Sequence, residues 1–136
     1  TTAVIKGTEF TIHVKVAFRD RIVAPIFAFS FKNIKGTEIT GTNSMIEKAF
    51  LEPVEAGTVK EVTFKQNMSL QGGEYLLSLG VTGYEGSEFQ VYHRLYDVLN
   101  VTVVSDKDTV GFYDMNSKVE VKNAAKDKVI PYRQEA

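Results

Sequence analysis

Aromatic rings and planar hydrogen-bonding groups are most densely mixed in one stretch of the chain, from Tyr92 to Asp97. A pyranose packs its apolar C–H face on an aromatic ring, and its hydroxyl groups need fixed polar partners such as arginine, aspartate, asparagine or histidine. The stretch is therefore typical of a carbohydrate site. In the structural alternative, Tyr92 and Tyr96 cover the face of a sheet and Arg94 pairs with Asp97.

Nothing in the sequence indicates a common catalytic motif. It contains no Walker A loop, dinucleotide fingerprint, H-E-x-x-H motif or G-x-S-x-G elbow. The absence of cysteine also excludes disulfides, thiolate zinc sites and thiol nucleophiles. We therefore expect neither catalysis nor a cofactor in this chain.

A metal site and a glycoside-hydrolysis site are two further possibilities, and the sequence supports both only weakly. A metal site would need His13 and His93 to meet a carboxylate, whereas their apolar neighbours at alternate positions predict that both point outward from strands. Glycoside hydrolysis would need two facing carboxylates, but clustered acids in turns usually cap and solvate the chain. The acids that are close in sequence are Asp97, Asp106, Asp108 and Asp114.

Length and charge limit the remaining classes of protein. A chain of 136 residues fits one compact domain. Its 16 basic and 17 acidic residues form no long block of one sign, which excludes the positive surface used to bind nucleic acid. No apolar run approaches the roughly 20 residues of a membrane-spanning helix. Because the chain does not begin with Met, we expect it to be a piece of a longer protein.

The elements that position these side chains are predicted to be strands, because β-branched residues are abundant and apolar residues alternate with polar ones. Phe27, Phe29 and Phe31 share one face, which implies a deep core. The expected strands cover 9–18, 25–31, 38–42, 59–65, 74–82 and 89–104, and a final short pair covers 111–115 and 118–122. The long strand is expected to bend near Tyr96 and Asp97, and residues 83–87 to form a loop.

About seven to nine strands with hardly any helix predict an all-β fold, an immunoglobulin-like antiparallel β-sandwich. A barrel is the alternative. The sandwich is expected to span residues 1–122. A polar C-terminal tail, 123–136, either pairs with a partner or frays.

Several short motifs gain specificity from their order and spacing. They are Gly7–Val16, Val23–Phe29, Lys35–Asn43, Gly73–Val81, Tyr92–Leu99 and Gly111–Met115, with Gly41-Thr42-Asn43 the most telling. Their layout resembles the C-terminal domain of Wzt-type ATP-binding proteins of polysaccharide exporters. The resemblance covers roughly residues 5–121.

The resemblance implies an immunoglobulin-like domain that follows a nucleotide-binding domain. Such a domain binds the modified non-reducing end of an O-antigen-like glycan in the cytoplasm, on an outer sheet face, and so licenses export. The implied partners are the glycan, the protein's own ATPase domain and the membrane subunit of the transporter, at the inner face of the bacterial inner membrane. Exchange of a C-terminal strand in a homodimer would involve Val119, Val121, Val129 and Ile130.

Members of this family bind different glycan end groups, so the residues that contact the glycan are inferred from this chain's own side chains. Lys15 and Arg94 would favour an anionic terminal group, although two cations also fit ordinary surface charge. The residues expected to include the glycan-binding side chains are His13, Lys15, Tyr92, His93, Arg94, Tyr96 and Asn100. The alternative functions are a structural or protein-interaction module without a glycan pocket, and an enzyme that acts on sugars.

Overall fold

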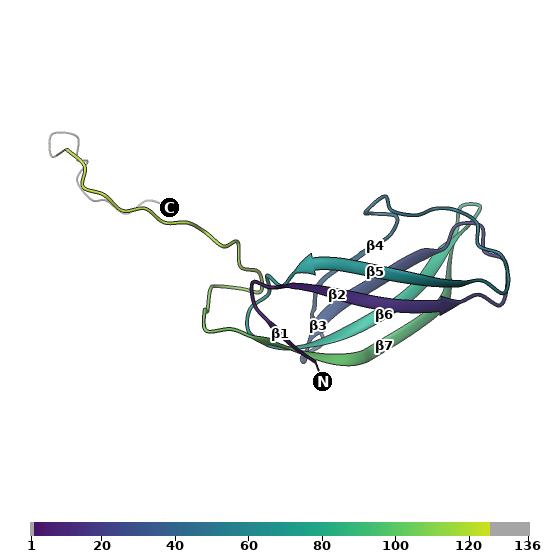
Figure 1. Cartoon of the computed structure of the whole chain (residues 1–136), viewed down its shortest axis with the longest axis horizontal. Coiled ribbons are helices and arrows are strands. Elements are labelled where there is room, and N and C mark those ends of the chain that lie inside the picture. Colours follow the sequence, from purple (N-terminus) through teal and green to yellow (C-terminus); the bar gives the residue numbers. More distant parts are fainter. Residues whose placement is uncertain (1, 126–136) are drawn as a thin grey trace.

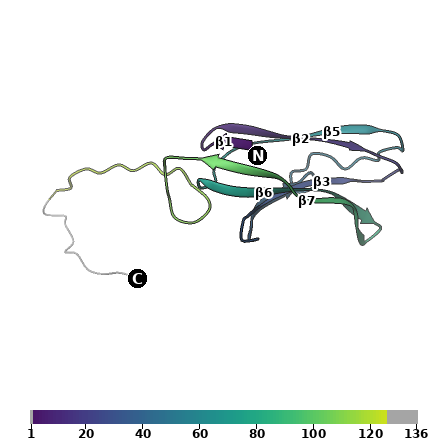
Figure 2. The ribbon, with the colours of Figure 1, turned by 90° about the horizontal axis from the view of Figure 1, so that it is seen from below.

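The computed structural model describes residues 2–125, which form seven strands in two sheets. The strands are β1 (Thr2–Ile5), β2 (Glu9–Ala17), β3 (Ile26–Asn33), β4 (Glu38–Asn43), β5 (Val59–Asn67), β6 (Gly73–Glu85) and β7 (Glu88–Val104). One sheet has the order β1-β7-β6-β3-β4, and β2 pairs with β5 in the other. The two sheets lie face to face (Figure 1, Figure 2). The expected all-β sandwich is confirmed.

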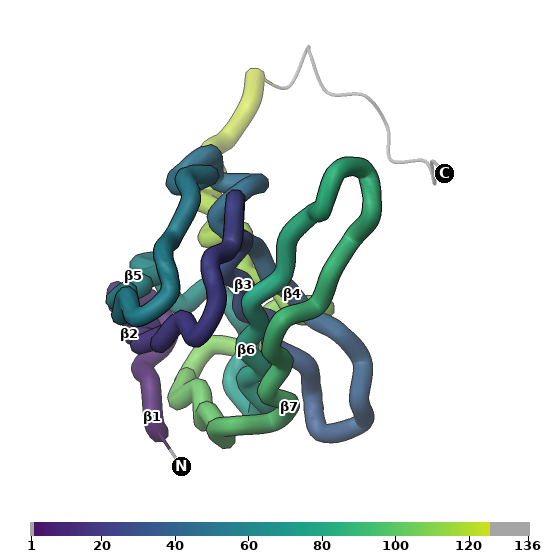
Figure 3. The backbone as a smooth tube through the Cα atoms, turned by 90° about the vertical axis from the view of Figure 1, so that its right-hand side faces the viewer, coloured from purple at the N-terminus to yellow at the C-terminus, as the bar shows by residue number. Residues whose placement is uncertain are grey.

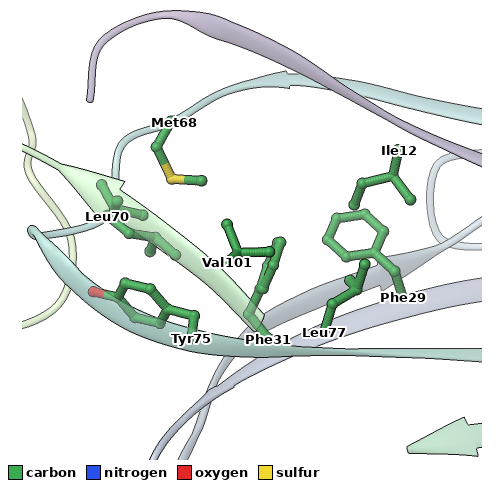
Figure 4. Packing of buried hydrophobic residues seen from close by; sticks show 9 residues of the cluster. Ile12, Phe29, Phe31, Met68, Leu70, Tyr75, Leu77 and Val101 are labelled. Atoms are coloured by element: carbon green, nitrogen blue, oxygen red, sulfur yellow. The ribbon is translucent and has the colours of Figure 1, made fainter. Parts of the chain in front are cut away.

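Alternating side chains from both sheets form the core, as the period of two predicts. Phe27, Phe29 and Phe31 on β3 are all buried, and Ile12 of β2 packs into the same interior. The Phe29 and Phe64 rings come from opposite sheets and meet edge to face, with centroids 4.9 Å apart. Figure 4 shows Phe29 and Ile12 pointing toward each other across the space between the layers. The predicted phenylalanine face is confirmed.

Four segments differ from the sequence prediction. β1, which the sequence did not indicate, pairs in parallel with the end of β7. The expected loop at 83–87 is wrong, because Glu85 pairs with Glu88 and leaves only a two-residue turn. The expected strands at 111–115 and 118–122 are also wrong, because these residues form only one isolated bridge, between Tyr113 and Leu70.

Charged side chains, rather than a strand, hold the segment after β7. The buried Asp114 carboxylate lies 3.0 Å from Lys6 Nζ and 2.9 Å from Lys107 Nζ. Lys6 also donates a hydrogen bond of 3.0 Å to Gln71 Oε1, and the Gln71 amide contacts the Thr109 hydroxyl. We call these five residues the clasp, because they tie the β1–β2 turn and the segment before β6 to residues 107–114.

Beyond the clasp, the described chain leads away from the sandwich (Figure 1). Val119 and Val121 are 83% and 90% exposed and belong to no strand. Val129 and Ile130 lie outside the described residues. The boundary between a sandwich of residues 1–122 and a tail of 123–136 stays a prediction.

Candidate functional site

The long strand β7 is irregular where the predicted site residues lie. Leu77 of β6 pairs with Leu99, but Leu79 pairs with Leu95, so four residues of β7 span the distance of two residues of β6. Asp97, within this bulge, has a left-handed backbone with φ of 52°. The expected bend at Tyr96 and Asp97 is confirmed. A bulge redirects the side chains around it, so neighbouring residues of β7 can serve different surfaces.

The seven predicted residues therefore do not meet at one site. His13 is exposed on β2, where it pairs with Thr63, and it lies on the opposite sheet from β7. Lys15, Tyr92 and His93 line a groove between β2 and the β6–β7 hairpin. The other three residues, Arg94, Tyr96 and Asn100, belong to the part of β7 that borders the outer face of the five-stranded sheet.

The groove has a volume of about 690 Å³ and an apolar floor that includes Val14, Leu79 and Val81. Tyr92 packs against the core beneath it, and burial together with the nearby Glu85 raises the pKa of its phenol. His93 pairs with the buried Val81, so it faces the groove. His93 is exposed, and the register shift beside Tyr92 places it on the side of β7 that borders the groove.

The outer face of the five-stranded sheet has a floor of small residues. Ser30 of β3 lies between Gly41 of β4 and Ser78 of β6, and in the next row Ala28 lies beside Gly80. A Cβ at Gly41 would lie 2.7 Å from the Phe29 carbonyl oxygen, so only glycine permits this close approach of β4 to β3. Larger polar side chains surround this floor.

Three of these surrounding residues are the predicted Arg94, Tyr96 and Asn100. Arg94 pairs with Gly80 and is exposed, and Tyr96 is 67% exposed. Asn100 pairs with Leu76. Its Oδ1 atom is buried and, among residues 2–125, accepts no hydrogen bond. A buried acceptor without a donor is costly, so this oxygen is a destabilising feature of the outer face.

Sequence reasoning missed Lys32 and Ser78, and it treated Asp97 only as a partner for Arg94 or as a possible catalytic acid. The Asp97 carboxylate pairs instead with Lys32 Nζ at 2.9 Å, and its backbone N–H donates to Ser78 Oγ at 3.1 Å. The β6–β7 hairpin projects beyond the neighbouring strands (Figure 3). Near its tip Tyr84 pairs with Phe89, and their ring centroids lie 5.4 Å apart. These residues come together through strand register, which no local sequence motif reveals.

Two of the four acids considered for hydrolysis have structural partners. Asp97 pairs with Lys32, and Asp114 lies in the clasp. Hydrogen bonds from Lys107, the Asn116 backbone and Lys6 hold the pKa of Asp114 well below its usual range. Within residues 2–125, no three histidine or acidic side chains are grouped to hold a metal ion, and no helix is long and apolar enough to cross a bilayer.

Comparison with known protein families identifies the family of this chain. A family model described as the Wzt C-terminal domain matches residues 1–115. The chain belongs to the Wzt C-terminal domain family. Domains of this family occur in ABC polysaccharide exporters. The family is not known for catalytic activity.

A solved structure agrees with this family at the level of the fold. The crystal structure of the C-terminal domain of Wzt aligns with a TM-score of 0.81 and 24% sequence identity. The alignment covers 88% of this chain and 74% of that one. No curated protein sequence matches the chain.

Proposed function

We propose that this Wzt-type domain is a non-catalytic carbohydrate-recognition module of a polysaccharide ABC exporter. It binds the modified non-reducing end of an O-antigen-like glycan and so licenses export. In the full-length protein it works beside an ATPase domain and the membrane subunit, at the cytoplasmic face of the inner membrane. Family membership supports the transporter context, and the outer face of the five-stranded sheet supports glycan binding.

The side chains of the outer face suit a sugar. Tyr96 offers an exposed ring for the apolar face of a pyranose, and Arg94, two residues earlier, offers a planar set of donors. The Lys32–Asp97 pair is only partly buried, with exposed fractions of 29% and 40%, so it can still exchange hydrogen bonds with hydroxyl groups. The small residues of the floor leave room for a ring above them.

The observation that carries the proposal is the grouping of the exposed Tyr96 ring with the partly exposed Lys32–Asp97 pair on one sheet face. The Oδ1 atom of Asn100 on the same face is buried and lacks a donor, so a shift of the side chains that cover it would let a sugar hydroxyl donate to it and remove the cost of the buried acceptor. In the free domain, the missing hydrogen bond of that oxygen lowers stability. Its stability and binding effects are therefore expected to have opposite signs.

We expect Asn100→Leu to leave the domain as stable as the parent, or more stable, while weakening glycan binding roughly tenfold. Isothermal titration with the capped polysaccharide measures the affinity, and thermal unfolding measures the stability. Asn67→Leu makes the same chemical change at an exposed position on the other sheet and serves as the control. Unchanged affinity in Asn100→Leu, beside the Asn67 control, would contradict this site.

The second expected partner is another copy of the chain. Between β4 and β5 lies a groove of about 950 Å³ lined by Phe29, Phe31 and Phe64, and β5 has a strand neighbour on only one side within residues 2–125. Val119 and Val121 alternate with charged residues, as in a strand with one buried face. We propose that they pair with the second copy, so the uncovered groove reflects dimerisation rather than a purely structural module.

We expect the double variant Val119→Asp, Val121→Asp to be a monomer at concentrations where the parent domain is a dimer, because the charges cannot enter an apolar groove. Light scattering after size-exclusion chromatography measures the mass. Val110→Asp, at a position 96% exposed, serves as the control that should remain dimeric. A parent domain that is monomeric throughout, or a double variant that stays dimeric, would refute the exchange.

A further inference from the structure

Charge is unevenly distributed over the outer face of the five-stranded sheet. At one end, Glu38 of β4 pairs with Lys32, and the Glu74 carboxylate accepts from the Thr102 hydroxyl at 2.9 Å. Asp97 neutralises Lys32 at 2.9 Å. This end, where Asn100 lies, therefore carries more carboxylates than cations.

The opposite end has the opposite charge. Arg94 pairs with Gly80, and the same row continues through Ala28 to Asn43, all of which are uncharged. Within residues 2–125, Arg94 forms no ion pair. Because Glu74 and Gly80 lie six residues apart on β6, the two ends are separated by about 20 Å, which exceeds the screening length in physiological salt.

We infer that this polarity fixes the direction in which a glycan end lies on the face, an inference that rests on the proposed function. An oxyanion on the terminal sugar, either a carboxylate or a phosphate, lies at Arg94 and beside Tyr96. The neutral sugars behind it extend toward Asp97 and Asn100. The substrate class is thus a glycan that ends in an anionic group.

The physical reason is the difference between the two sets of partners. A guanidinium offers a fork of N–H donors that matches an oxyanion in shape and charge. At the other end, the same anion would meet the carboxylates of Glu38 and Glu74, which repel it. Asp97 lies between the two ends, beside Ser78, and Lys32 neutralises it. Neutral hydroxyl groups have the reverse preference, because carboxylates and the Asn100 oxygen accept hydrogen bonds from them.

The test is a backbone-amide NMR titration of the isotope-labelled domain with three probes: methyl glucoside, methyl glucuronide and inorganic phosphate. We expect methyl glucuronide and phosphate to shift the amides of Arg94 and Tyr96, and methyl glucoside to shift those of Ser78 and Asn100. Arg94→Gln should weaken both anionic probes roughly tenfold and leave methyl glucoside unchanged. Added salt should act in the same way as the substitution.

Lys65→Gln, which removes an exposed cation from the other sheet, is the control that should leave all three titrations unchanged. If methyl glucuronide shifts the Asn100 end, or if Arg94→Gln leaves the anionic probes unaffected, the inferred direction is wrong while sugar binding stands. If neither sugar shifts this face, the proposed glycan site fails as well.

Discussion

Replacing Phe29 by alanine lowers the free energy of unfolding by about 3–5 kcal/mol, because the substitution leaves a cavity between the two sheets. Phe29 is 7% exposed and meets two other rings edge to face. One of these rings, Phe64, belongs to the β2–β5 sheet. The two-stranded sheet has few other elements to hold it, so the loss weakens the contact between the layers.

Urea denaturation followed by circular dichroism measures this loss. Since small domains have total stabilities of about 5–15 kcal/mol, the variant should unfold at much lower urea concentration. Phe112→Ala removes the same ring at a position 49% exposed and should cost far less. Similar losses for the two variants would show that Phe29 does not join the sheets as described.

Replacing Asp114 by asparagine has the second large effect, a fall of several degrees in the midpoint of thermal unfolding at neutral pH. The carboxylate neutralises Lys6, whose side chain is only 8% exposed, and the substitution leaves that ammonium group buried without a counter-charge. The segment at 107–114 should then detach first. Hydrogen exchange at the Asp114 and Gln71 amides, which bond to Ser69 and Phe112, would report this opening.

The clasp also predicts how stability depends on pH. The pKa of Asp114 in the folded state lies below its ordinary value of 3.8, because Lys107, the Asn116 backbone and Lys6 favour the ionised form. Its contribution is therefore complete above about pH 4 and is lost as the pH falls toward the lowered pKa. Asp114→Asn should lose less stability than the parent on acidification from neutral pH to pH 3.

Glu55→Gln is the control, because the Arg21–Glu55 pair is exposed and such pairs contribute little. Thermal midpoints measured across the acid range should follow the parent for this control. If the thermal midpoints of Asp114→Asn also followed those of the parent, the contacts of the clasp would not contribute to stability.

Alternation along the chain was enough to predict most of the sandwich. The periods in residues 9–18 and 25–31 reflect burial of one face, which requires only the local pattern. The four residues of β1 are too few for such a pattern, and their partner on β7 lies far away in sequence. The clasp could not be predicted from the sequence either, because Lys6, Gln71 and Asp114 meet only after the strands have paired.

The candidate site was predicted only in part, for a related reason. Aromatic and planar polar residues pointed to Tyr92–Asn100, but the register shift beside Tyr92 and the alternation along β7 place Tyr92 and His93 at the groove and Arg94 on the outer face. Lys32 and Ser78 join the outer face through register alone. Composition can therefore identify the type of chemistry, whereas the surface on which it occurs depends on backbone irregularities.

We propose that the outer face recognises a modified glycan end. Isothermal titration of the parent domain with the same polysaccharide, with and without its terminal modification, tests this claim most directly. We expect measurable binding of the modified polymer and at least roughly tenfold weaker binding of the unmodified one. Equal affinity for the two polymers would contradict it.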